Sequence, residues 1–401
     1  MTVRQRASRG AHREAVTWSR LLGLCFALAL MLPLVSCHGP STKRKEVVSG
    51  SAQTSEAVQP VAVDSAFARL VERLSEPDGY FDTDNLISNE RSYLHVLGGM
   101  REQGVQGGAY LGVGPDQNFA YIAQVRPEIA FIIDIRRDNL LQHLFFKALF
   151  NAARNRLEYV CLLFGKPVPP DVAAWSDGPI EQLLAYIDET PGWEGHRTEA
   201  LALVQDEVRR SGLALSDEDL AAIDRIHTQF IHAGLDLKFT SHNRPPRYYY
   251  PSYRDLLLET DLTGRQGAYL AREEDFQFIK AMQHQDLIVP VVGDLAGGHA
   301  LAAIGAYLAE RGMTVSAFYT SNVEFYLMRR RRFARFVENV RHLPLDTQSV
   351  IIRSYFNRFS AEHPQTVPGY ASTQLLQPIE RLVDGYEQGR YQTYRDLINR
   401  E

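Results

Sequence analysis

The sequence has little cysteine, and its one uncharged apolar segment is short. Of the three cysteines in 401 residues, two fall within the first 37 positions and only Cys161 follows them. One thiol excludes an internal disulfide and a cysteine-rich zinc site from the body of the protein. The uncharged apolar run 21–35 has 15 residues, whereas a helix needs about 20 to span a bilayer.

Basic residues are also scarce outside the N-terminus. The net charge is −5, and after position 37 there are 38 basic and 47 acidic residues, a net of −9. Because nucleic-acid binding depends on neutralising phosphates, we expect no nucleic-acid partner. The sequence contains no His-Glu-x-x-His pattern, lysine-containing phosphate loop or Gly-x-Ser-x-Gly elbow, and we expect no metal site. With 45% hydrophobic residues, the composition is that of a globular protein.

The N-terminus resembles a bacterial lipoprotein signal peptide. Five arginines precede the apolar run, which ends in Leu34-Val35-Ser36-Cys37, a sequence similar to the lipobox. The resemblance implies that residues 1–36 are cleaved and that Cys37 carries a lipid. It places the protein outside the cytoplasm, anchored to the cell membrane or the outer membrane. Residues 37–64 are then a flexible tether. The alternative is an uncleaved anchor with an incidental cysteine, which leaves the body in the cytoplasm.

The body alternates strand-like and helix-like segments. Apolar runs at 130–135 and 287–293 are typical of strands buried on both faces. This pattern predicts an α/β fold with a mostly parallel sheet and helices on both faces. We expect a core, a mostly helical insertion, and a C-terminal helical segment, with single long helices at 139–164 and 325–341. The expected boundaries are 65–136 and 286–370 for the core, 137–285 for the insertion and 371–401 for the C-terminal segment.

Glycines and acids stand at the ends of the expected strands. Gly112 and Gly114 follow the first strand, Asp134 ends the second, and Asp294 follows the third. Glycines at a strand end let the backbone approach a ligand closely, and an acid at the tip of the neighbouring strand accepts hydrogen bonds from a ribose diol.

These segments resemble the class I S-adenosylmethionine-dependent methyltransferase fold, a Rossmann-like architecture, over about 79–136 and 286–356. The resemblance implies S-adenosylmethionine as cofactor. It places Gly112 and Gly114 beside the cofactor, Asp134 on its ribose and Asp294 on its adenine.

The segment before the first strand closes over the cofactor in that family. By this analogy Asn85, Asn89 and Glu90, with Ser88, line the pocket. The alternative is that Asp84 or Ser88 caps the following helix.

The sequence departs from the family pattern in three places. Tyr110 stands where the family has an acid that helps to hold the methionine part, and Asp116 stands where it has a third glycine. After the fourth strand, Tyr319-Thr-Ser-Asn322 replaces Asn-Pro-Pro-Tyr. Catalytic residues and the methyl acceptor therefore stay unassigned.

Several other polar residues have two interpretations. The 117–118 pair touches ligand or caps a helix, and Arg136-Arg137 binds an anion or pairs with Asp138 and nearby acids. His143 is a core residue or a catalyst, and His299 faces the cleft or is structural.

Two further segments are unusual in composition. The loop 238–253 holds four tyrosines, His242, Arg244 and Arg247. Residues 329–332 are all arginine, and Arg335 follows. The arginines form an exposed helix face or approach anionic lipid headgroups.

Two functions fit the sequence. One is a membrane-tethered enzyme that binds a small nucleoside and transfers a methyl group from S-adenosylmethionine. The other is a non-catalytic extracytoplasmic lipoprotein that uses the same fold to bind a ligand or a protein partner, since fold does not imply function.

Overall fold

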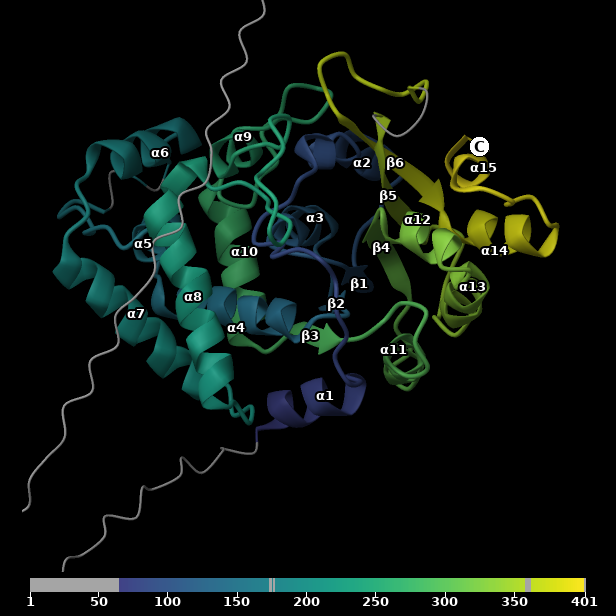
Figure 1. The fold of residues 1–401 in the computed structure, drawn as a ribbon, viewed down its shortest axis with the longest axis horizontal. Coiled ribbons are helices and arrows are strands. Elements are labelled where there is room, and N and C mark those ends of the chain that lie inside the picture. The colour runs from purple at the N-terminus through teal and green to yellow at the C-terminus, as the bar shows by residue number, and fades with distance from the viewer. Residues whose placement is uncertain (1–64, 173–174, 176, 358–361, 400–401) are drawn as a thin grey trace, which may run out of the picture. The chain divides into compact units, whose positions relative to one another are not determined.

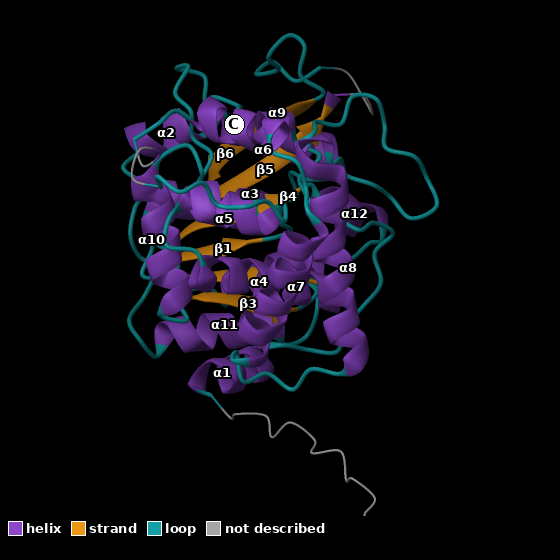
Figure 2. Ribbon diagram, turned by 90° about the vertical axis from the view of Figure 1, so that its left-hand side faces the viewer, coloured by secondary structure: helices purple, strands orange, loops and turns teal. Residues whose placement is uncertain are grey.

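A six-stranded sheet with the order β3-β2-β1-β4-β5-β6 forms the centre of the fold (Figure 1). Strands β1 to β5 are parallel, and β6 runs antiparallel to β5 at one edge. Figure 2 shows the strands following one another from β6 at the top to β3 at the bottom. The strands are β1 (Ala109–Gly112), β2 (Ile129–Asp134), β3 (Ile288–Val292), β4 (Val315–Ser321), β5 (Val350–Phe356) and β6 (Ser372–Pro378).

The computed structural model describes residues 65–399 except 173, 174, 176 and 358–361. Residues 60–401 form one compact unit. The expected signal peptide, Cys37 and the tether lie outside the described residues. Within the described part, no helix has both the length and the apolar character needed to cross a membrane.

Helices cover both faces of the sheet, as expected. On one side α3 (Gln117–Val125), α4 (Arg137–Ala152) and α10 (Glu273–His284) pack together, and α4 lies against β2 and β3. On the other side lie α1 (Ala66–Leu74), α11 (Ala300–Ala309), α13 (Phe333–Arg341) and α14 (Ile379–Glu387). Because both faces are covered, β3 is buried along its whole length and β2 is buried up to Asp134, which explains their continuous apolar runs.

Residues 137–285 are mostly helical, as expected. The first helix of this stretch, α4, lies against the sheet, and the last, α10, packs on α3 and α4, so both belong to the core. The helix α8 begins after a Ser216 cap, and Asp219 completes a capping box. The helices between α4 and α10 are α5 (Arg156–Leu163), α6 (Ile180–Glu189), α7 (Glu194–Arg209), α8 (Asp217–Ala233) and α9 (Tyr253–Leu257).

Two predicted long helices are each broken in two. The expected helix 139–164 is interrupted between α4 and α5, where Asn155 caps the second helix by accepting a hydrogen bond from the Glu158 backbone N–H. The expected helix 325–341 is divided into α12 (Val323–Arg329) and α13, and Arg331 between them has a left-handed φ of 57°.

The ends of the core also differ from the prediction. The C-terminal segment 371–401 begins with the strand β6 before its helices α14 and α15 (Tyr394–Asn399). The helix expected to follow Ser88 is a 3₁₀ turn, η1 (Arg91–Leu94), followed by α2 (Leu97–Glu102). A second 3₁₀ turn, η3 (Gly234–Asp236), follows α8.

Candidate functional site

An open cleft lies at the carboxyl edge of the sheet, where the strand order reverses between β1 and β4. Residues that follow β1, β2, β3 and β4 line it, together with segment 81–90 and α12. Its empty space, counted out to the solvent at its mouth, is about 1030 Å³. Open parallel sheets bind their ligands at this point.

The cleft brings together six of the seven ligand-binding residues predicted from the sequence. They come from four separate segments, so the sheet topology assembles them. These six are Asn85, Asn89, Glu90, Gly114, Asp134 and Asp294.

The two glycines after β1 have different roles. Gly114 has a φ of +82°, and a Cβ there would lie 3.2 Å from Gln117 Nε2 and 3.3 Å from Asn85 Nδ2, inside the cleft. Gly112 is not among the residues that line the cleft. A Cβ on Gly112 would collide with Asn118 Oδ1, which accepts a hydrogen bond from Tyr110 Oη at 2.8 Å. Gly112 therefore makes room for this buried pair of side chains.

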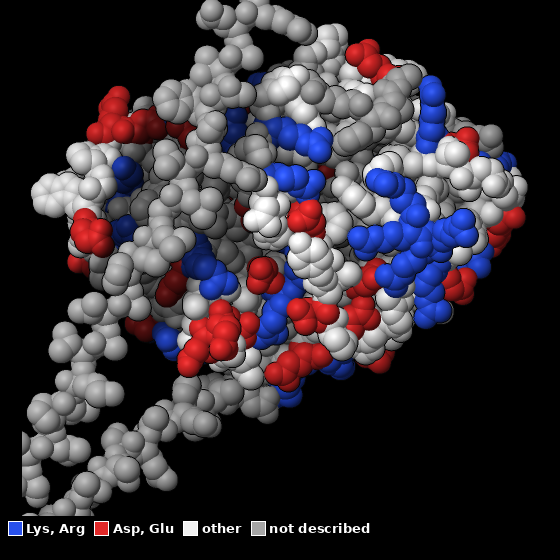
Figure 3. Space-filling view, viewed as in Figure 1, with Lys and Arg blue, Asp and Glu red and all other residues white. Residues whose placement is uncertain are grey.

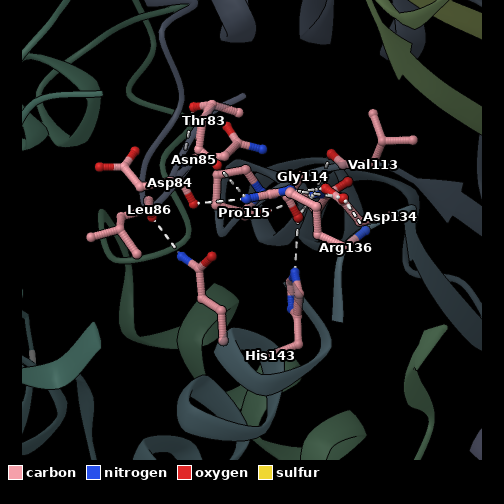
Figure 4. A network of polar contacts seen from close by, with 12 residues as sticks. Thr83, Asp84, Asn85, Leu86, Val113, Gly114, Pro115, Asp134, Arg136 and His143 are labelled. Carbon is pink, nitrogen blue, oxygen red and sulfur yellow. Dashed lines mark hydrogen bonds and ion pairs between the residues drawn. The ribbon is translucent and has the colours of Figure 1, made fainter. Parts of the chain in front are cut away.

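Buried side chains hold the glycine turn from beneath (Figure 4). Asn118 Nδ2 lies 3.0 Å from the Val113 carbonyl and 2.7 Å from the Pro115 carbonyl, and His143 Nε2 donates to the Gly114 carbonyl at 2.9 Å. Burial lowers the pKa of His143 to about 4, so the ring is neutral at pH 7 with its proton on Nε2. His143 is thus a core residue that positions the turn. Asn118 acts in the same way and caps no helix.

Arg136 fills most of the hydrogen-bond acceptor positions of the Asp134 carboxylate. Oδ1 accepts the Arg136 backbone N–H at 2.9 Å and its Nε–H at 3.0 Å, while Oδ2 accepts Nη2–H at 2.9 Å. Arg136 Nη1 donates to the carbonyls of Thr83 at 3.0 Å and Asp84 at 2.9 Å. A carboxylate offers about four acceptor positions, so one position on Oδ2 remains. One N–H of Arg136 Nη2 also remains.

Asp294 lies in the same cleft beside a second arginine. Oδ1 accepts the Ala296 backbone N–H at 2.8 Å, and Oδ2 forms an ion pair with Arg332. The Asp294 side chain is 18% exposed, so its remaining acceptor positions can reach a ligand.

Glu90 is a buried carboxylate at the floor of the cleft. Oε2 accepts from Tyr319 Oη at 2.6 Å and from Gln374 Nε2 at 2.8 Å, and the hydroxyls of Ser321 and Ser354 complete the shell. Glu90 is 1% exposed. Within the described residues, no lysine, arginine or histidine forms an ion pair with it. A buried anion surrounded only by neutral donors is suited to pairing with a cationic group of a ligand.

Two non-glycine residues with left-handed backbone line the cleft. Asn85 has a φ of 50°, and Ser321, at the end of β4, has a φ of 53°. Such conformations cost energy, and they gather at ligand-binding sites.

The capping interpretation of segment 84–88 is wrong. Asp84 accepts the Thr240 backbone N–H at 3.2 Å and also bonds the Thr240 hydroxyl. Ser88 Oγ accepts the Glu90 backbone N–H at 3.0 Å. These bonds tie the segment to loop 238–250 and shape its turn beside the cleft.

Five residues that the sequence did not assign as cofactor contacts also line the cleft: Gln117, Arg136, Tyr319, Ser321 and Arg332. For Gln117 and Arg136, contact with a ligand was one of two interpretations. The strand-end rule identifies only the first acid or glycine after each strand. Extending it by three residues would have included Arg136 and Ser321.

Other candidates lie elsewhere. His299 is not among the residues that line the cleft; it is exposed, and its Nε2 lies 2.8 Å from the Arg73 carbonyl. Arg137 pairs with Asp219 at 2.7 Å. The two arginines 136 and 137 thus pair with acids, as one interpretation expected, although not with Asp138.

In the part of the chain that the structure describes, no cluster of three His, Cys, Asp or Glu residues could hold a metal ion.

Comparison with known proteins gives one family. The family model described as "Domain of unknown function (DUF7790)" matches residues 86–166 and 213–399. The matched ranges contain the cleft residues from Ser88 onward, and Asn85 stands one position before them. No curated protein matches the chain.

Proposed function

The chain belongs to the family described as a domain of unknown function, DUF7790, and from the geometry of its cleft we propose that it binds a nucleoside of the S-adenosylmethionine class. The observation that carries the proposal is the meeting of Gly114, Asp134, Asp294 and segment 85–90 in one cleft at the point where the strand order reverses. In α/β sheets this is the position of nucleotide ligands.

The sheet supports a methyltransferase-type architecture. The order β3-β2-β1-β4-β5 is that of Rossmann-like folds. The antiparallel strand beside β5 is typical of the methyltransferase fold that the sequence resembles. In a dinucleotide-binding sheet all strands are parallel.

The Asp134–Arg136 pair is suited to a ribose diol in a specific way. Asp134 Oδ2 keeps one acceptor position, and Arg136 Nη2 keeps one donor. One ribose hydroxyl would donate to the carboxylate, while the other would accept from the guanidinium. In the expected arrangement the carboxylate alone accepts a hydrogen bond from each of the two ribose hydroxyls. Here the carboxylate and the guanidinium would each bind one hydroxyl.

Two further acids are suited to the rest of the ligand. Asp294 has acceptor positions for an exocyclic amine of the base. Glu90, which is buried without a basic partner among the described residues, would attract the ammonium of the amino-acid part by its charge, since four donors already fill its acceptor positions. It would supply the negative charge that Tyr110 does not, because Tyr110 is fully buried and bonded to Asn118.

Methyl transfer is the activity that this ligand implies. When bound, S-adenosylmethionine supplies an electrophilic methyl group on a sulfonium. The protein then has mainly to align the acceptor and exclude water, so we assign no catalytic residue. Ser321 and Asn322, which follow β4, line the cleft and are the residues in the place of the family's acceptor-binding motif.

A non-catalytic binding function is the second candidate. Arg136 fills three of the four acceptor positions of Asp134, and an exported protein would be separated from a methyl donor made in the cytoplasm. Both observations favour a lipoprotein that uses the cleft to bind a ligand or a protein partner.

Calorimetry with S-adenosylmethionine and S-adenosylhomocysteine separates these candidates. The chain from His38 onward contains the whole unit 60–401 and lacks the cysteine expected to carry a lipid. We expect binding that Asp134→Ala abolishes and Asp219→Ala preserves, since Asp219 forms the comparable pair with Arg137 outside the cleft. Absence of heat with both nucleosides in the parent protein would remove the nucleoside proposal.

We also propose that Cys37 is lipidated and anchors the protein outside the cytoplasm. Globomycin blocks the signal peptidase of lipoproteins. It should therefore cause the uncleaved precursor to accumulate, and Cys37→Ser should do the same without the drug. Normal processing in both cases would contradict the anchor.

A further inference from the structure

The tyrosine-rich loop and the arginine run, which are far apart in the sequence, meet at the mouth of the cleft. Tyr326 of α12 lines the cleft and packs edge-on against Phe81, with ring centroids 5.0 Å apart. Burial raises the pKa of Tyr326, and the positive charges of Arg247, Arg329, Arg244 and Arg330 all oppose that rise. The charges of four arginines from two segments therefore act on one tyrosine that lines the cleft.

The loop is fixed to the cleft wall by specific contacts. Arg244 pairs with Asp82, and the Tyr80 and His242 rings stack with centroids 6.4 Å apart. Burial raises the pKa of Tyr250, and the side chain of Asn89, one of the residues that line the cleft, opposes that rise. The loop is thus part of the rim of the cleft, which we define as residues 80–82, 242–250 and 326–332.

The rim has uncompensated positive charge. Arg329, Arg330 and Arg331 are exposed, and none of them forms an ion pair with an acid among the residues that the structure describes. Figure 3 shows Lys and Arg gathered on the face of the molecule that carries α12 and α13. Since the body has a net charge of −9, this local excess orients the protein toward an anionic partner.

The rim also presents exposed aromatic rings. Tyr248 is 80% exposed and Tyr80 is 72% exposed, two of the few large apolar side chains that face solvent among the described residues. Arginines beside exposed tyrosines are the combination found where proteins meet membrane headgroups, because the ring enters the interface while the guanidinium pairs with phosphate.

We propose that the rim of the cleft docks on a membrane surface that contains anionic phospholipids. The expected lipid on Cys37 stands 28 positions before Ser65, and a chain of that length spans at most roughly 100 Å. The tether therefore allows the rim to reach the bilayer. Docking turns the mouth of the cleft toward the headgroups and does not depend on which nucleoside the cleft binds.

Sedimentation with vesicles tests the docking. The chain from His38 onward, which lacks a lipid of its own, should bind vesicles of phosphatidylcholine with phosphatidylglycerol and not vesicles of phosphatidylcholine alone. High salt should release it, because the attraction is electrostatic. Each arginine near an anionic leaflet contributes about a factor of five, so the triple change Arg329→Gln, Arg330→Gln and Arg331→Gln should weaken binding about 100-fold.

A matched control separates the rim from total charge. Arg209→Gln, Arg225→Gln and Arg390→Gln remove three exposed arginines elsewhere and should leave vesicle binding unchanged. Tyr248→Ser should weaken it without changing the charge.

Equal loss in both triple variants would overturn the proposal, as would equal binding to neutral vesicles. Binding of inorganic phosphate or of an acidic protein at the rim, without vesicle binding, would also overturn it. Since nucleoside calorimetry is measured without vesicles, failure of docking and failure of nucleoside binding are distinguishable.

Discussion

Arg136 holds Asp134 by two side-chain hydrogen bonds of 2.9 and 3.0 Å, and the same guanidinium binds the carbonyls of Thr83 and Asp84. One side chain thus joins the end of β2 to the segment that closes the cleft. The side chains of Arg136 and Asp134 are 8% and 14% exposed, so the pair is only weakly screened by water.

Arg136→Ala should destabilise the protein by about 3 kcal/mol, because it leaves a mostly buried carboxylate and two carbonyls without partners. Arg137→Ala is the matched control. Its side chain is 40% exposed and pairs with Asp219, and its loss should cost less than about 1 kcal/mol. Urea unfolding of both variants measures the difference, and equal costs would show that the Arg136 pair has no special role.

Gly114→Ala should abolish nucleoside binding while changing stability little. The residue has a φ of +82°, and its Cβ would project beside Asn85 and Gln117. Gly104→Ala has a comparable backbone strain, with a φ of +66° and no atom within 4 Å of the added Cβ. Both should lose about 1 kcal/mol in unfolding experiments. Calorimetry should then detect a loss of binding only for Gly114→Ala, and an equal loss in both variants would contradict its place in the site.

Much of the sheet could be predicted from the sequence because its central strands are buried on both faces. Asp134 and Asp294 lie at one edge since parallel strands end there, and their meeting needs only correct topology. The strand β6 was missed because its first residues, Ser372, Thr373 and Gln374, are polar although buried. Their partners, such as Glu90 for Gln374, lie far away in the sequence, so no local pattern indicates a strand.

The helix breaks and the acid that pairs with Arg136 were missed for a related reason. Apolar spacing continues from α4 into α5, and only the cap at Asn155 marks the break. Pairing of Arg136 with Asp134 depends on the turn after β2, which brings residues two positions apart face to face. The sequence predicted Gly112 as a ligand contact, whereas in the structure it makes room for Asn118. That packing arises only when α3 folds back over the turn, so the sequence does not show it.

Glu90→Gln should weaken binding of S-adenosylhomocysteine about tenfold, because it removes the negative charge opposite the ligand's ammonium. It should leave binding of 5′-methylthioadenosine, which lacks the amino-acid part, unchanged. Tyr319→Phe removes one donor to Glu90 without altering its charge and should affect the two nucleosides alike. Calorimetry with both ligands gives the ratio of their affinities for each variant. A parallel loss of affinity for both in Glu90→Gln would mean that Glu90 only supports the structure.

Asp116 should make the stability of the protein fall as the pH rises from about 4 to about 7. Burial raises the pKa of its carboxyl to about 6, although Tyr253 and Tyr269 donate to it at 2.6 and 3.3 Å. The folded state therefore binds this proton more tightly than the unfolded chain does. Its contribution is complete below the unfolded pKa and is lost as the pH rises through about 6.

Asp116→Asn removes that dependence, because the amide does not ionise. Urea unfolding at several pH values should show the variant gaining about 3 kcal/mol relative to the parent between pH ~4 and ~7. Burial lowers the pKa of His143 and of His227 to about 4. Their contributions are lost as the pH falls through this range, but they are common to both proteins and cancel in the difference. In Asp219→Asn the pKa of the replaced carboxyl is lowered, chiefly by its hydrogen bond from Arg137. Its difference from the parent should therefore stay flat above pH ~5. A flat difference for Asp116→Asn as well would show that this carboxyl is ionised in the folded protein at an ordinary pH.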